Sequence, residues 1–123
     1  RAVTFAGTVS DAELGDWLAR AHLFVTASEY EGFGISVLEA MTARTVPVVN
    51  ALPAFESFVH DGVNGFFTDF ARPNETAEKL SRLLHMEVQA LAVLARQAQE
   101  TGQRYAWETV VEKWLALYGE LMG

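Results

Sequence analysis

The sequence predicts an α/β protein: a short parallel sheet flanked by helices, with a helical C-terminus. Short apolar runs at residues 23–27, 46–50 and 66–67 have the length and composition of buried strands, and helical patterns separate them. Strands that alternate with helices favour a parallel sheet, because parallel neighbours need a crossover connection. After residue 73 the apolar residues recur at helical spacing, so the rest of the chain is expected to be helical.

The N-terminal part begins with a predicted strand and a predicted helix. Val3–Gly7 alternates in hydrophobicity, is rich in β-prone residues and ends at a glycine. Ser10 and Glu13 have the spacing of a capping box, which predicts that a helix starts after Ser10. Its apolar residues recur at helical spacing and include Trp17, so we expect Trp17 to pack in the core. We expect His22, at the end of this helix, to cap it or to pack.

A buried strand, a glycine turn and a helix then follow in direct succession. Leu23–Ala27 is the predicted strand, and the apolar repeat of Ile35 and Leu38 predicts the helix. Gly32 and Gly34 are poor helix formers and belong in the turn. Ligands of open α/β sheets bind at the carboxyl ends of strands, so this junction is the candidate site.

The second half predicts turns and three more helices. Two turn dipeptides within Asp61–Gly65 precede the short strand at residues 66–67, and Asn74 is a candidate N-cap for the first of these helices. His85 has no Asp, Glu or His at metal-ligand spacing, so no metal site is predicted there. The last helix, Trp107–Met122, is apolar over a broad arc, which indicates either contact with another domain or burial in this one.

Size and composition narrow the class of protein. With 123 residues, half of them hydrophobic, the chain fits one globular domain with a core. A net charge of −7 argues against nucleic acid or an anionic membrane as the main partner. The absence of cysteine excludes a disulfide framework and fits a reducing compartment, so we expect a cytoplasmic location. No apolar run approaches the roughly 20 residues of a transmembrane helix.

The junction has the chemistry of a nucleotide-sugar site. The free N–H groups of Phe33, Gly34 and Ile35 would face outward at a helix N-terminus, where an anion is favoured. Glu31 and Glu39 would lie roughly 12 Å apart along a helix, too far for an acid/base pair of glycosidase type, at about 5 to 9.5 Å. Each carboxylate instead suits a hydroxyl-rich group. A nucleoside diphosphate sugar has an anionic centre and hydroxyls at both ends.

These residues also resemble a known signature. Glu31–Ile35 followed by Glu39–Met41 is similar to the signature of retaining glycosyltransferases of family 4, two glutamates separated by seven residues. That family has the two-domain GT-B fold, so the resemblance implies a partial Rossmann-like domain. Other landmarks of the family follow its order: Val3–Gly7, Pro47–Val49, Asp61–Gly65 and Tyr105–Glu108. The chain departs from the family at Ala43–Thr45, where the family usually has a glycine that suits a left-handed helix end.

The resemblance implies a role for each site residue. Glu31 would be the catalytic residue and hold hydroxyls of the transferred sugar near its reacting carbon. The implied donor-binding residues are Gly32, Phe33, Gly34, Ile35, Ser36 and Glu39. Among them, Glu39 would hold the ribose diol and Ser36 would add a hydroxyl contact to phosphate. Configuration would be retained by same-face attack, with the leaving diphosphate taking the proton. No metal or other cofactor is implied.

The resemblance also implies partners. Residues 1–123 would form a single, incomplete domain, the C-terminal donor-binding half of a GT-B enzyme. The chain starts at the family's third strand, so the basic pair that clamps the diphosphate and the N-terminal acceptor domain would be missing. We therefore expect this piece alone to be inactive. Missing strands would leave sheet edges bare, so we expect Val3–Gly7 either to slide beside Leu23–Ala27 or to pair with another chain in a homodimer or strand-swapped assembly.

Two other classes of function remain. The chain could be a non-catalytic module that keeps the fold for folding or assembly and binds nothing well. A Rossmann-type oxidoreductase would need a third glycine after Gly32 and Gly34 and an acidic residue closing the next strand, and the sequence has neither.

Overall fold

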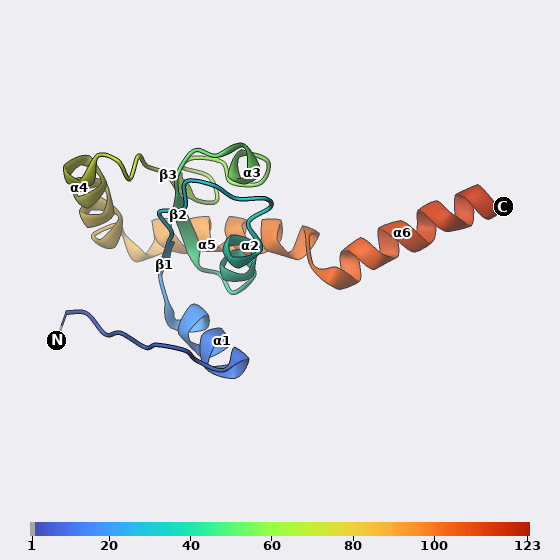
Figure 1. The fold of residues 1–123 in the computed structure, drawn as a ribbon, viewed down its shortest axis with the longest axis horizontal. Coiled ribbons are helices and arrows are strands. Elements are labelled where there is room, and N and C mark those ends of the chain that lie inside the picture. Colours follow the sequence, from blue (N-terminus) through green and yellow to red (C-terminus); the bar gives the residue numbers. More distant parts are fainter. Residues whose placement is uncertain (1) are drawn as a thin grey trace.

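The computed structural model describes residues 2–123 as a three-stranded parallel sheet with six helices (Figure 1). Along the chain the elements are α1 (Asp11–Arg20), β1 (Leu23–Val25), α2 (Ile35–Thr42), β2 (Val46–Val49), α3 (Pro53–Glu56), β3 (Phe66–Phe67), α4 (Pro73–Leu84), α5 (Val88–Arg104) and α6 (Trp107–Met122). The strands lie in the order β1-β2-β3, and all pairs are parallel. The predicted Rossmann-like α/β class is confirmed.

Strand β2 is the centre of the sheet. It pairs with β1 in the register Leu23 to Val46 and with β3 in the register Val48 to Phe66. All four of its residues are buried, as expected for a strand with neighbours on both edges and helices on both faces. Because the strands are parallel, their carboxyl ends lie on the same edge of the sheet.

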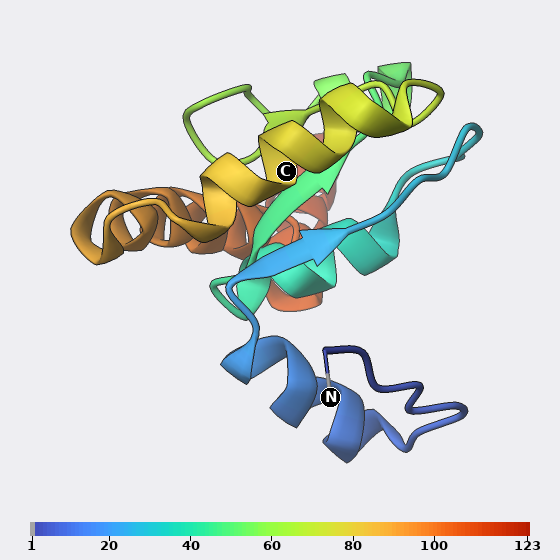
Figure 2. The same cartoon turned by 90° about the vertical axis from the view of Figure 1, so that its left-hand side faces the viewer.

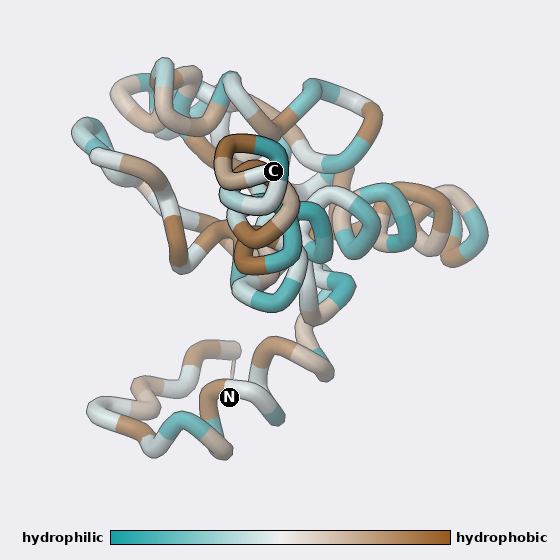
Figure 3. The backbone as a smooth tube through the Cα atoms, turned by 90° about the vertical axis from the view of Figure 1, so that its right-hand side faces the viewer, coloured by the Kyte–Doolittle hydropathy of each residue, from teal (hydrophilic) through white to brown (hydrophobic). Residues whose placement is uncertain are grey.

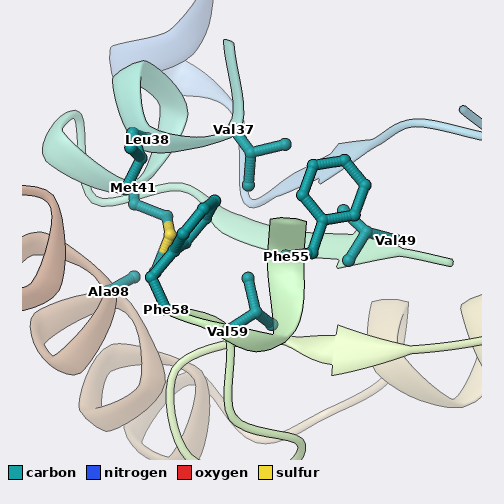
Figure 4. Packing of buried hydrophobic residues seen from close by; sticks show 8 residues of the cluster. All are labelled: Val37, Leu38, Met41, Val49, Phe55, Phe58, Val59 and Ala98. Carbon is teal, nitrogen blue, oxygen red and sulfur yellow. The ribbon is translucent and has the colours of Figure 1, made fainter. Parts of the chain in front are cut away.

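The core lies between the sheet and helices α2, α3 and α5 (Figure 4). It is built from these buried side chains: Val37, Leu38, Met41, Val49, Phe55, Phe58, Val59 and Ala98. Helix α5 approaches α2 closely at Gly102, where a Cβ atom would come within 2.6 Å of the backbone nitrogen of Thr42. A glycine is therefore needed for the two helices to pack at this distance.

The N-terminal segment corrects one prediction and confirms another. Val3–Gly7 is not a strand, and Phe5 is 90% exposed. It does not pair with β1, so the expected slide beside Leu23–Ala27 is wrong. The alternating pattern gives strand propensity, but the segment lies beside α1, away from the open edge of β1 (Figure 2). The capping box is confirmed, because Ser10 Oγ accepts from the N–H of Glu13 at 3.2 Å and Glu13 Oε2 accepts from the N–H of Ser10 at 2.9 Å.

Helix α1 lies apart from the sheet with the N-terminal segment beside it (Figure 2). All ten of its residues are described and none is buried. Trp17, expected in the core, is 48% exposed, and the guanidinium of Arg20 lies 5.8 Å from the centre of its ring. The predicted helix is present, but no described element buries its stripe of apolar residues.

Helix α6 projects away from the body (Figure 1). None of the residues Trp107–Met122, all of them described, is buried, so burial on this domain does not explain the broad apolar arc. Figure 3 looks along this helix and shows hydrophobic and hydrophilic residues side by side on it. Among residues 2–123, no helix is both long and apolar enough to cross a membrane.

Two helix ends differ from simple expectation. Asn74 is not the N-cap of α4, because the helix begins at Pro73 with Arg72 as N-cap; a proline fits the first turn, where its missing N–H has no partner to lose. At the end of α2, Arg44 has a left-handed φ of 65°. The N–H of Arg44 bonds to the carbonyl of Met41 at 3.0 Å and that of Thr45 to Ala40 at 2.9 Å, which is the Schellman pattern. The turn thus keeps its geometry without the glycine.

Candidate functional site

The candidate site lies where β1 leaves the sheet and α2 begins. The loop between them extends beyond the carboxyl end of β1 (Figure 2). Asn50, directly after β2, joins this loop to the loop between β3 and α4. Its Nδ2 donates to the carbonyl of Ser28 at 3.0 Å, and its Oδ1 accepts from the N–H of Phe70 at 3.1 Å. One side chain therefore fixes the loops after β1 and β3.

Asn50 is a positioning residue that our sequence analysis did not single out. It also lines a pocket of about 520 Å³ at the carboxyl edge, together with Glu29 and Asp69. The available signal was a polar residue directly after an apolar run, at the sheet edge where ligands bind.

The glycine turn is required by both space and backbone conformation. Gly34 is the N-cap of α2 with a left-handed φ of 93°, and it is buried. A Cβ atom there would lie 2.7 Å from Phe55 Cε1 and 3.2 Å from Phe58 Cζ. A Cβ atom at Gly32, by contrast, would meet no described atom within 4 Å, so that side of the turn is open. Gly34 therefore packs against the core, and Gly32 lies next to open space.

No side chain caps the N-terminus of α2. The first intrahelical bond at this end runs from the N–H of Leu38 to the carbonyl of Gly34 at 3.2 Å. The N–H groups of the first turn therefore have no helical partners and carry the positive end of the helix dipole. Next to this helix start, the space around Gly32 is free of side chains.

A groove of about 890 Å³ lies between α1, α2 and the junction of α5 with α6; we call it the α1–α2 groove. Phe33, Ile35 and Glu39 line it, opposite Leu14 and Leu18 of α1. The other predicted site residues are not among its lining residues: Glu31, Gly32, Gly34 and Ser36. The structure thus brings three of the seven predicted residues to one groove. Glu31 is half-buried in the loop before α2, and Ser36 is exposed on α2.

The α1–α2 groove is mainly apolar, and its charged lining residues are Asp11 and Glu39. No lysine or arginine lines it. Residues 2–123 also contain no group of three or more His, Cys, Asp or Glu side chains arranged to hold a metal ion. An anionic ligand at this end of α2 would therefore meet backbone N–H groups, and the positive charge that it needs must come from elsewhere.

The model of the family described as glycosyl transferases group 1 matches residues 1–102. The chain belongs to this family. It is 32% identical over 102 residues to a poly(ribitol-phosphate) alpha-N-acetylglucosaminyltransferase of Staphylococcus aureus, covering 78% of this chain and 20% of that protein. It is 29% identical over 117 residues to a GDP-mannose:cellobiosyl-diphosphopolyprenol alpha-mannosyltransferase of Komagataeibacter xylinus, covering 93% of this chain and 29% of that protein.

The solved structures give the same result for the fold. A sucrose-phosphate synthase from Thermosynechococcus elongatus matches with a TM-score of 0.84 and 26% identity, over 98% of this chain and 30% of that one. The predictions of a glycosyltransferase and of a GT-B type of fold are confirmed. The chain spans less than a third of the length of these relatives.

Proposed function

We propose that this chain is the donor-binding domain of a retaining glycosyltransferase that takes its sugar from a nucleoside diphosphate sugar. The observation that carries the proposal is the junction of β1 and α2, where a glycine turn leads into an uncapped helix N-terminus beside the α1–α2 groove. Membership of the glycosyltransferase family supports it. The full reaction belongs to a longer protein, in which an N-terminal domain binds the acceptor.

In this proposal the nucleotide-sugar donor lies along the N-terminal end of α2. Glu39, which lines the groove, accepts hydrogen bonds from the two ribose hydroxyls. The N–H groups of Phe33, Gly34 and Ile35 meet the distal phosphate or sugar hydroxyls, because a helix N-terminus favours negative charge. The hydroxyl of Ser36 adds a phosphate contact, and the open space at Gly32 lets the ligand approach the backbone.

Glu31 has the catalytic role in this scheme. From the loop before α2 it holds hydroxyls of the transferred sugar and so fixes the anomeric carbon for attack. The acceptor oxygen attacks from the face that the diphosphate leaves. The bond between the anomeric carbon and the diphosphate oxygen breaks, a new glycosidic bond forms, and the diphosphate takes the acceptor's proton. Its charge is neutralised by the α2 dipole and by cations outside this chain, without a metal ion.

Calorimetric titration of the chain with UDP, GDP and ADP sugars tests the proposal. We expect binding of one of them, weakened by Glu39→Ala about tenfold or more, because two hydrogen bonds to a charged group are lost. Glu78→Ala is the matched control: it removes an exposed acid from α4, away from the groove, and should leave the affinity unchanged. If a folded chain shows no detectable binding at millimolar ligand, the result would instead support the second candidate, a non-catalytic module that keeps the fold.

Pairing with another chain is a separate proposal. Within residues 2–123, β1 has β2 as its one strand neighbour, so its outer edge is open to a strand from elsewhere. A homodimer or strand-swapped assembly through this edge would appear as twice the chain mass in light scattering. A monomer at all concentrations would contradict it.

A further inference from the structure

A smaller pocket of about 290 Å³ lies at the corner between α5 and α6; we call it the corner pocket. Its basic side chains come from three separate parts of the chain. Arg104 is the last residue of α5, Lys113 lies on α6, and His60 follows α3. Tyr105 lines both this pocket and the α1–α2 groove, but Glu39 and the glycine turn do not reach the corner pocket.

The clustering of cations here is unexpected for so acidic a chain. The sequence has nine Lys and Arg residues against 16 Asp and Glu. Within residues 2–123 the ion pairs engage Arg72 and Lys79, and no described carboxylate lies within 4.0 Å of the cationic groups of Arg104 or Lys113. Arg104 and Lys113 are both exposed, so water screens their mutual repulsion, but both keep N–H donors that an anion in the pocket can accept from.

Two of the three residues that bring a hydroxyl group to the corner pocket, Ser57 and Thr101, already use it as a donor. Thr101 Oγ1 donates to the carbonyl of Gln97 at 3.0 Å and accepts from Asn64 Nδ2 at 3.0 Å. Ser57 Oγ donates to the carbonyl of Ala54 at 2.8 Å. Both oxygens keep lone pairs, so they can accept hydrogen bonds from hydroxyl groups of a ligand.

The remaining lining is apolar. Phe58 and Val110 supply it, and Tyr105 adds an aromatic face. The Phe58 and Tyr105 rings lie 5.8 Å apart, and both contact the wider aromatic cluster with Phe33. A ligand with an anionic group, several hydroxyls and a hydrocarbon face matches these three kinds of lining.

We propose that the corner pocket binds a small phosphorylated sugar or polyol, separately from the nucleotide-sugar donor. Its phosphate lies between Arg104 and Lys113, and the His60 ring adds an N–H donor. Its hydroxyls donate to Ser57 and Thr101. Because Lys113 lies on α6 and His60 on the body, the bound molecule bridges the two and holds α6 at a fixed angle.

Calorimetric titration of the chain with inorganic phosphate, glucose 6-phosphate and glucose tests this proposal. We expect phosphate to bind weakly, glucose 6-phosphate to bind more tightly because of its hydroxyls, and glucose not to bind. Arg104→Ala and Lys113→Ala should each weaken glucose 6-phosphate about tenfold or more, since each removes a charge-assisted contact.

Two control substitutions test whether the effects are specific to the corner pocket. Arg96→Ala removes the same charge from the exposed side of the same helix, outside the pocket, and should leave binding unchanged. Glu39→Ala should also leave it unchanged, which separates this site from the donor site. The proposal is overturned if neither phosphate compound binds, if phosphate binds as tightly as glucose 6-phosphate, or if Arg96→Ala or Glu39→Ala weakens binding as much as Arg104→Ala does.

Discussion

Replacing Arg44 with glycine should stabilise the chain. Arg44 has a left-handed φ of 65° in the turn that ends α2, and a residue with a Cβ in that conformation is strained by roughly 1–2 kcal/mol. Glycine removes this strain but loses more backbone freedom on folding, an opposing effect of roughly 0.5–1 kcal/mol. We therefore expect a net gain of about 0.5–1 kcal/mol in the free energy of unfolding, seen as a Tm higher by roughly 2–5 °C.

Arg44→Ala is the matched control for this substitution. The Arg44 side chain lines a small pocket with Val88 and Leu91, so removing it could itself change stability. Arg44→Ala removes the same side chain but keeps a Cβ at the positive φ, and we expect no gain from it. Urea unfolding of the three proteins measures the difference. If Arg44→Gly is no more stable than Arg44→Ala, the strain argument is wrong.

Three further substitutions test the packing of the glycine turn and the buried hydrogen bonds of Asn64. Gly34→Ala should destabilise the chain by about 2–4 kcal/mol, because the added Cβ would overlap Phe55 and residue 34 has a left-handed φ. Gly32→Ala should change the urea midpoint of unfolding little, because the space around Gly32 is open. Equal effects of the two substitutions would contradict this account of the turn. Asn64→Ala should lower the free energy of unfolding by about 2–4 kcal/mol, because the buried Asn64 side chain makes three hydrogen bonds, and a loss below about 0.5 kcal/mol in thermal unfolding would refute that role.

The parts of the fold that depend on local pattern were predictable. The strand at Leu23, the turn at Gly32 and Gly34 and the helix from Ile35 follow from residues close together in the sequence, and the structure has all three. The strand is shorter than predicted, Leu23–Val25 instead of Leu23–Ala27, and none of its residues is buried, because β1 lies at the edge of the sheet. The capping box at Ser10 was predictable for the same reason. Local pattern failed where a partner was needed: Val3–Gly7 is β-prone, but pairing depends on an edge that sequence alone does not locate.

The candidate site was predictable in part. Glu39, Phe33 and Ile35 share the α1–α2 groove because they flank one helix start, which spacing can show. The corner pocket was not predictable, since His60 and Lys113 are 53 positions apart and share a pocket only through the packing of α5 and α6 beside the loop after α3. Arg44 shows a third case: the missing glycine was visible in the sequence, but only the hydrogen bonds show that the turn survives without it.

The position of Gly102 has a consequence for the C-terminal end of the chain. Gly102 is the last buried residue; after it, the Tyr105 ring packs against Phe58 at 5.8 Å, but none of the described residues 103–123 is itself buried. A protease that cuts near Tyr105 would therefore release α6 as a peptide and leave a compact remnant with its sheet intact. The orientation of α6 can thus change, through evolution or ligand binding, without any repacking of the interior.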